Sequence, residues 1–114
     1  NRLRLRFLQN YFRFIYKVNH PYLVRGCNIA FWKEDLLRVN GYNEDIIGWG
    51  YEDNELGARL IFAGIKRQFL KMGAVGYHLD HPINSRDKVN QNHKTFLETI
   101  NSEGTYCQNG LDKY

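Results

Sequence analysis

The chain has 114 residues and a formal net charge of +4, from 16 basic and 12 acidic side chains. This length suits one domain or a part of one. The mildly basic balance fits an anionic substrate, an acidic membrane surface or nucleic acid, and it does not choose among them. No apolar run approaches the roughly 18 residues of a spanning helix, which excludes a transmembrane helix within this sequence. The sequence does not begin with methionine, and we expect it to be a segment of a longer protein.

The two cysteines indicate the redox compartment. Cys27 and Cys107 lie far apart in the sequence and lack the paired spacing of a zinc or redox site. This pattern favours a reduced, intracellular protein, and one long-range disulfide is the alternative.

The first element is a predicted basic amphipathic helix over residues 2–18, and we assign residues 1–21 to this segment. Its apolar side would pack on the body of the protein or rest on an anionic lipid surface. No base-reading motif accompanies the charge, so nucleic acid is not an expected partner. The basic residues are Arg2, Arg6, Arg13 and Lys17, and the apolar residues are Leu3, Phe7, Leu8, Tyr11, Phe12, Ile15 and Tyr16.

Strand and helix patterns follow one another after this segment. Strands are predicted at residues 22–31, 66–71 and 74–79, and helices at residues 33–39, 52–63 and 86–100. The expected fold class is therefore α/β, with short mixed strands and three to four helices. Gly26 interrupts the first strand, as at a bulge or a close approach to a ligand.

Local signals set the predicted helix ends. Asn40–Gly41 would end the second helix and Gly64 the third, because both are typical C-terminal caps. Ser85 would cap the start of the last helix. The remaining residues, 101–114, form a polar tail that we expect to be loosely held.

The segment Gly48–Trp49–Gly50 is followed by two acids, Glu52 and Asp53, where a helix begins. Glycines let the backbone approach a ligand and adopt angles that a Cβ would forbid. The indole offers a flat apolar face of the kind on which sugars stack. Acids in a first helical turn are common, but an exposed tryptophan between glycines is costly unless it meets a ligand. The segment therefore predicts a binding site with a carboxylate base.

Several short stretches, taken in their order and spacing, carry a resemblance to a known family. They are Arg-Gly-Cys-Asn-Ile-Ala-Phe-Trp at residues 25–32, Asn-Gly-Tyr at 40–42, Gly-Trp-Gly-Tyr-Glu-Asp-Asn-Glu-Leu at 48–56, Arg59–Leu60, Tyr-His-Leu-Asp-His-Pro at 77–82, Arg86 and Asn92. Together they resemble the C-terminal half of family 2 inverting glycosyltransferases. They are also similar to the C-terminal domain of galactosyltransferases and to chondroitin-polymerase-type enzymes. The likeness covers residues 22–97. It implies a GT-A fold, in which a nucleotide-sugar-binding half precedes an acceptor-binding half, and residues 22–100 would be this C-terminal glycosyltransferase domain.

The resemblance assigns roles to five residues. Asp53 resembles the catalytic base that removes the proton of the acceptor hydroxyl, and Glu52 resembles an acceptor-binding or base-orienting carboxylate. Trp49 holds the position of an aromatic residue against the sugars, and Gly50 gives the backbone room beneath them. Asn28 looks like a residue of the donor-side pocket, although an asparagine in a strand also serves a neighbouring loop.

The resemblance also implies a divalent metal cofactor, Mn²⁺ or Mg²⁺, that stabilises the leaving diphosphate. His78 resembles the histidine that completes the metal site, and His81 is its rival three residues later. Arg86 would meet the diphosphate or occupy the first turn of the last helix. No Asp-x-Asp motif precedes Arg25, so we expect the isolated chain to be inactive.

The sequence thus predicts part of an enzyme that transfers a hexose or N-acetylhexosamine, with inversion, from a nucleotide diphosphate sugar to a glycan or lipid-linked acceptor. Polysaccharide or lipopolysaccharide biosynthesis at the cytoplasmic face of a membrane is the expected setting. Self-association through a face left by the missing half is a further expectation. Two alternatives stay open: a non-catalytic carbohydrate-binding module, and a basic adaptor for membranes or nucleic acid that depends on the first eighteen residues.

Overall fold

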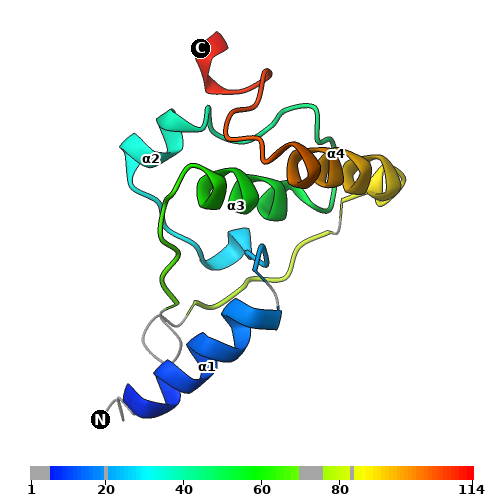
Figure 1. Cartoon of the computed structure of the whole chain (residues 1–114). Helices are drawn as coiled ribbons and strands as arrows, with labels where there is room; N and C mark the ends of the chain where they lie inside the picture. Colours follow the sequence, from blue (N-terminus) through cyan, green and yellow to red (C-terminus); the bar gives the residue numbers. More distant parts are fainter. Residues whose placement is uncertain (1–5, 20, 70–75, 83) are drawn as a thin grey trace.

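The computed structural model describes residues 6–19, 21–69, 76–82 and 84–114, and in this part of the chain all regular structure is helical. Figure 1 shows α3 and α4 in the middle of the molecule, with α1 projecting at one end and the C-terminus at the other. The elements in chain order are α1 (Arg6–Asn19), the 3₁₀ turn η1 (Gly26–Asn28), α2 (Lys33–Arg38), α3 (Glu52–Phe62), α4 (Val89–Ser102) and the 3₁₀ turn η2 (Leu111–Lys113).

The α/β expectation with short mixed strands is wrong, because the described residues form helices and no strand or sheet. The backbone is extended at Arg25, Ile29 and Trp32, with ψ values of 110°, 149° and 140°. Extended backbone becomes a strand only when a neighbouring segment supplies the ladder of hydrogen bonds. η1 also interrupts the first predicted strand. The other two predicted strands lie partly outside the described residues, and their described parts, 66–69 and 76–79, carry no ladder.

The core lies where α3 meets its neighbours. Val39, Leu56 and Leu60 are buried at its centre. α4 packs along α3, and Tyr22 fits between them with its ring centroid 5.8 Å from Phe62 and 6.2 Å from Phe96. Phe31, Leu36, Ala63 and Ile65 pack around this centre. The core therefore fixes α3, which carries the predicted acids at its N-terminal end.

The predicted ends of α2 and α3 are confirmed. Gly64 has a φ of +82° after α3, and the Ile65 N–H returns to the Leu60 carbonyl at 2.9 Å, which is the pattern of a glycine-capped helix. α4 begins at Val89 rather than at residue 86. Ser85 does not cap it, because its hydroxyl hydrogen-bonds Asp87 instead.

The C-terminal tail is tied down, contrary to expectation. The Asn40 side-chain amide donates to the Cys107 carbonyl at 2.8 Å and to the Asp112 carboxylate at 2.7 Å. The Leu111 N–H donates to the Asn40 carbonyl at 3.0 Å. Asn40 is 2% exposed and has a φ of +64°, a conformation that asparagine tolerates better than most residues. The turn after α2 therefore anchors the tail.

α1 carries several uncovered apolar side chains. Phe7, Tyr11 and Phe14 are each more than half exposed, whereas Leu8, Phe12 and Ile15 are half-buried. None of the described helices combines the length and apolarity needed to cross a bilayer. The two cysteines are free thiols, Cys27 exposed and Cys107 buried, so the long-range disulfide does not form.

Candidate active site

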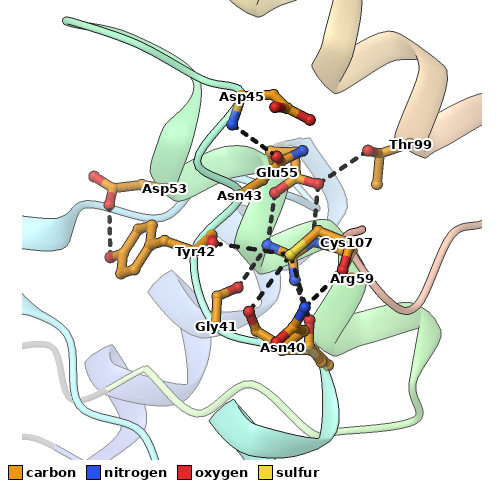
Figure 2. Close-up of polar contacts among 11 residues, drawn as sticks. Asn40, Gly41, Tyr42, Asn43, Asp45, Asp53, Glu55, Arg59, Thr99 and Cys107 are labelled. Carbon is orange, nitrogen blue, oxygen red and sulfur yellow. Dashed lines mark hydrogen bonds and ion pairs between the residues drawn. The ribbon is translucent and has the colours of Figure 1, made fainter. Parts of the chain in front are cut away.

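Asp53, in the first turn of α3, is held by two neutral donors. The Gly26 N–H donates to its Oδ2 at 2.6 Å, and the Tyr42 hydroxyl donates to its Oδ1 at 3.0 Å. Figure 2 shows the Tyr42 hydroxyl directed at this carboxylate. Asp53 is half-buried, and it makes no ion pair with another described residue. The carboxylate is thus fixed in direction without a cation to neutralise it.

Gly26 is required for this contact. A Cβ at position 26 would lie 2.5 Å from Oδ1 of Asp53 and 2.9 Å from Oδ2, closer than van der Waals contact allows. The sequence predicted a bulge or a close approach to a ligand at this glycine; the group that lies close to it in the structure is the Asp53 carboxylate.

We expect Gly26→Ala to displace the Asp53 side chain while the fold persists, because Gly26 is exposed and its φ is not in the left-handed region. Sugar transfer by the protein that carries this domain should then fall by more than tenfold, about the cost of losing one positioned hydrogen bond to a charged group. Steady-state transfer rates and circular dichroism check this prediction. Unchanged transfer would show that the position of Asp53 does not matter.

Tyr42 is the second donor, and its environment keeps the phenol protonated. Burial, then the negative charge of Asp53 and the hydrogen bond to it, and then the charge of Glu52 raise the pKa of Tyr42 from 10.0 to about 12. Each cause disfavours the phenolate. Tyr42 therefore remains a donor to Asp53 across the physiological pH range.

This shift predicts a pH dependence of stability. The folded pKa lies above the unfolded value, so the stabilisation is complete below pH 10 and is lost as pH rises through about 12. Unfolding midpoints should fall more steeply between pH 10 and 12 in the wild-type chain than in Tyr42→Phe. Tyr77→Phe, which removes a phenol that is 91% exposed, is the control. Equal slopes for wild type and Tyr42→Phe would contradict the prediction.

Glu52 folds back on the loop that precedes α3. Its Oε2 accepts the Gly50 N–H at 2.8 Å, which satisfies one backbone donor near the helix start. Gly48, Gly50 and Tyr51 have φ values of +82°, +105° and +70°, so the loop requires a left-handed backbone at three positions. The Tyr51 ring stacks on His93 and Phe96 of α4, with centroids 4.6 and 5.6 Å apart, and this stacking holds a conformation that is strained for tyrosine.

The indole of Trp49 is 44% exposed and is held from α4 and the segment before it. Asn92, which is 1% exposed, donates from its side-chain amide to the Ile47 carbonyl at 3.1 Å. The backbone N–H of Trp49 donates to the Ser85 carbonyl at 3.3 Å. The Arg86 guanidinium lies over the indole ring at 4.5 Å from its centroid. The tryptophan is therefore a supported surface group and not a core residue.

A buried network lies directly behind the acids. Arg59 pairs with Glu55 through two hydrogen bonds of 2.8 Å, and both side chains are 1% exposed. Arg59 also donates to the carbonyls of Val39 and Gly41, and the Thr99 hydroxyl donates to Glu55 at 3.0 Å. Figure 2 shows these groups converging between α3 and the turn after α2. The network fixes the turn that immediately precedes Tyr42.

Asn28 lines a groove that Glu52 and Asp53 do not line, although Gly26 of the same turn contacts Asp53. This open groove of about 910 Å³ lies between α3 and the extended segments, and it is also lined by Arg25, Phe31, Trp32 and others. A smaller polar hollow of about 350 Å³ lies over Glu55, Arg59 and Thr99. Asp53 and Trp49 line neither of these cavities, so the structure does not bring Asn28 into one cavity with them.

His78 and His81 lie close together, with ring centroids 5.1 Å apart, and both are exposed. Within the described ranges no group of three histidine, cysteine or acidic side chains gathers to hold a metal ion. These residues alone do not form a complete metal site, and no chemical step can be derived through a metal from them.

The sequence reasoning missed three supporting residues. It gave no role to Tyr42, Asn92 or Tyr51, although all three lie in the stretches that carry the resemblance. Their roles depend on contacts across 11 to 45 positions, such as the bond from Tyr42 to Asp53 and that from Asn92 to Ile47. The nearest sequence signal was a polar residue, Asn92, placed on the apolar face of a predicted helix.

Residues 8–82 match the protein family described as "N-terminal domain of galactosyltransferase". Over 57 residues the chain is 40% identical to a chondroitin synthase of Escherichia coli, an alignment that covers 50% of this chain and 8% of that protein. The chain thus spans a small part of this relative's length. The family description names an N-terminal domain, whereas the sequence resemblance indicates a C-terminal half, so the position in a longer protein stays a prediction. No solved structure matches the chain significantly.

Proposed function

The chain belongs to the galactosyltransferase family that matches residues 8–82, and from this membership we propose that Asp53 is the base of an inverting sugar transfer. The family makes the chain a glycosyltransferase-type domain. The donor, the acceptor and the stereochemistry are parts of the proposal.

The observation that carries the proposal is the setting of the Asp53 carboxylate. Two neutral donors, the Gly26 N–H and the Tyr42 hydroxyl, fix both oxygens. Each carboxylate oxygen can accept more than one hydrogen bond, so capacity remains for an acceptor hydroxyl. A base needs this combination of fixed direction and an uncancelled charge.

In the proposed step the acceptor hydroxyl oxygen attacks the anomeric carbon of the donor sugar. The bond from that carbon to the nucleotide diphosphate breaks on the opposite face, and its electron pair leaves with the diphosphate. The hydroxyl proton passes to Asp53. Glu52 orients the loop before α3 through its bond to the Gly50 N–H. Its carboxylate also binds the acceptor in this proposal.

The remaining assignments complete the site. Trp49 offers its indole to the sugar rings, and the backbone at Gly50 leaves room beneath them. Asn28 is proposed to line the donor-side pocket, and Arg86 to bind substrate. The donor is a nucleotide diphosphate hexose or N-acetylhexosamine and the acceptor is a glycan or lipid-linked sugar. The enzyme would work in the cytoplasm at the inner face of a membrane. The exposed side chains of α1 would contact this membrane surface.

A divalent cation, Mn²⁺ or Mg²⁺, remains part of the proposal, with His78 as a ligand and other ligands from outside the described residues. We expect His78→Ala to raise the Mn²⁺ concentration needed for half-maximal transfer by more than tenfold, because loss of one ligand weakens a site strongly. His81→Ala is the matched control and should change it much less. Equal effects would remove His78 from this role.

The function is tested by incubating the protein that carries this domain with a panel of nucleotide sugars, with and without Mn²⁺. Transfer from one donor, with inverted configuration at the anomeric carbon by NMR, supports the proposal. Sugar binding that depends on Trp49, without transfer from any donor, would instead favour a non-catalytic carbohydrate-binding module.

A further inference from the structure

One face of α4 lies along the loop that carries Trp49. The buried side-chain amide of Asn92 donates to the Ile47 carbonyl at 3.1 Å and to the Trp49 carbonyl at 3.5 Å. A Cβ on Gly50 would lie 3.6 Å from Cγ2 of Val89, so Val89 lies against the backbone of that glycine. The spacings of three and four residues along this face place its members on one side of the helix: Val89, Asn92, His93 and Phe96.

Tyr51 is the residue at which this loop passes into α3. Its φ of +70° and ψ of −7° lie in the left-handed region, where a residue with a Cβ is strained. The Tyr51 carbonyl accepts the first hydrogen bond of the helix, from the Glu55 N–H at 2.9 Å. Trp49 lies two residues before this turn, and Glu52 and Asp53 follow it directly. The backbone angles of Tyr51 therefore set the direction of the indole relative to the two carboxylates.

A stack of rings on α4 offsets the strain at Tyr51. The His93 ring centroid lies 4.6 Å from that of Tyr51 at an interplanar angle of 25°, and the Phe96 centroid lies 5.6 Å away at 24°. Among the described residues, the Tyr51 side chain makes no capping hydrogen bond to the helix start. One stacked pair contributes a free energy of the same order as the cost of a left-handed backbone. Loss of one ring should therefore let Tyr51 populate other backbone conformations.

His93 is the member of the stack that lies outside the core. Phe96 also packs on Tyr22, with centroids 6.2 Å apart, and so belongs to the contact between α3 and α4. His93 is exposed, and its described ring contacts are with Tyr51 and Phe96. Removal of the His93 ring should thus disturb the turn at Tyr51 while the core stays intact.

We propose that His93 is a positioning residue of the sugar transfer. By stacking on Tyr51 it keeps the left-handed turn that holds Trp49 and the two acids in one arrangement, and it acts through Tyr51 rather than on the substrate. This inference rests on the proposed function, because it names a residue on which the geometry of that site depends. The effect should concern the acceptor, which meets the indole and the carboxylates, and not the binding of the donor.

The first test compares His93→Ala, His93→Phe and the control Gln91→Ala in the protein that carries this domain. Gln91 is exposed on α4, two positions before His93. The kcat/KM for the acceptor should fall about three- to tenfold in His93→Ala, the factor that corresponds to one stacked aromatic pair. His93→Phe should retain most of the wild-type value because phenylalanine keeps a stacked ring, and Gln91→Ala should match the wild type. The KM of the donor should be the same in all four proteins.

A glycine at position 51 separates positioning from general support of α4. Glycine adopts a left-handed backbone without a Cβ clash, so the turn no longer needs a ring stacked on it. In the Tyr51→Gly background, His93→Ala should therefore change the kcat/KM for the acceptor by less than about twofold, which a double-mutant cycle measures. The same loss in both backgrounds would show that His93 only stabilises α4, and it would overturn the inference.

The indole N–H resonance of Trp49 reports the positional effect independently of activity. The chain has two tryptophans, so Trp49→Phe identifies the resonance in NMR spectra of the ¹⁵N-labelled chain, and Trp32, which is 78% exposed, provides an internal reference. His93→Ala should move the Trp49 resonance and leave that of Trp32 in place. Gln91→Ala should move neither.

Two further results would overturn the inference. An unmoved Trp49 resonance in His93→Ala would show that the stack does not position the loop. A moved resonance with a wild-type kcat/KM for the acceptor would show that this positioning does not matter for transfer. Failure of the proposed function has a different signature: the wild-type protein would transfer no sugar from any donor, and the role of His93 in transfer would fall with it, while the Trp49 resonance would still respond to His93→Ala.

Discussion

Replacing Asp53 by asparagine should reduce sugar transfer by roughly two to four orders of magnitude, the usual contribution of a positioned general base. The amide keeps the size of the side chain. Its one oxygen can accept from the Gly26 N–H while its NH2 donates to the Tyr42 hydroxyl oxygen, at the two places where the carboxylate oxygens accepted, but it cannot take the acceptor proton. We therefore expect the loss in kcat, with donor binding near that of the wild type. Steady-state kinetics in the protein that carries this domain, with donor binding measured by calorimetry, check the prediction.

The matched control is Asp45→Asn in the same protein. Asp45 is exposed and accepts the Asn109 side-chain amide at 2.8 Å, a contact that an asparagine oxygen can keep. Like Asp53→Asn, this variant removes one carboxylate charge, here from the loop between α2 and α3, and it leaves the proposed base unchanged. Transfer in Asp53→Asn at more than half the wild-type rate would exclude Asp53 as the base.

Replacing Arg59 by methionine should lower the free energy of unfolding by about 3–5 kcal/mol, the typical cost of breaking a buried ion pair from one side. Glu55 would remain 1% exposed without its cation, and the carbonyls of Val39 and Gly41 would lose their donors. Guanidinium titration followed by circular dichroism measures the change. A loss below about 1 kcal/mol, the scale of one ordinary hydrogen bond, would contradict this account of the network.

Lys94→Met is the matched control, because it removes a lysine from another i,i+4 pair. Lys94 and Glu98 on α4 are 78% and 64% exposed and 3.9 Å apart, and such pairs contribute about 0.5 kcal/mol or less. If Arg59→Met does not fold, Thr99→Val tests the same network, since it removes only the 3.0 Å hydrogen bond to Glu55. That variant should cost about 1 kcal/mol.

The helices were predictable because their signals are local. The expected helices at 33–39 and 52–63 correspond to α2 (Lys33–Arg38) and α3 (Glu52–Phe62), whose ends carry Asn40 and Gly64. The start of α4 was misplaced because Ser85 bonds Asp87 two residues on, a local competition that composition does not reveal. The strands were wrong because a strand depends on a partner segment, which no local pattern specifies.

The candidate site was predictable in its residues but not in its contacts. The glycine–tryptophan–glycine loop and the two acids indicated the position of the candidate site. The bond from Gly26 to Asp53 spans 27 positions and that from Asn40 to Cys107 spans 67, and sequence periodicity contains no information about such pairs. The separation of 67 positions between Asn40 and Cys107 also explains why the tail was expected to be loosely held.

The anchoring of the tail changes where this domain should be cut. A fragment that stops at residue 100, the boundary that the sequence indicated, would leave the buried amide of Asn40 without the Cys107 carbonyl and the Asp112 carboxylate. Asn40 adjoins Val39 and Gly41, whose carbonyls receive Arg59, so truncation there would also disturb the support of Tyr42. The last fourteen residues therefore belong to the folding unit, and recombinant versions should retain them.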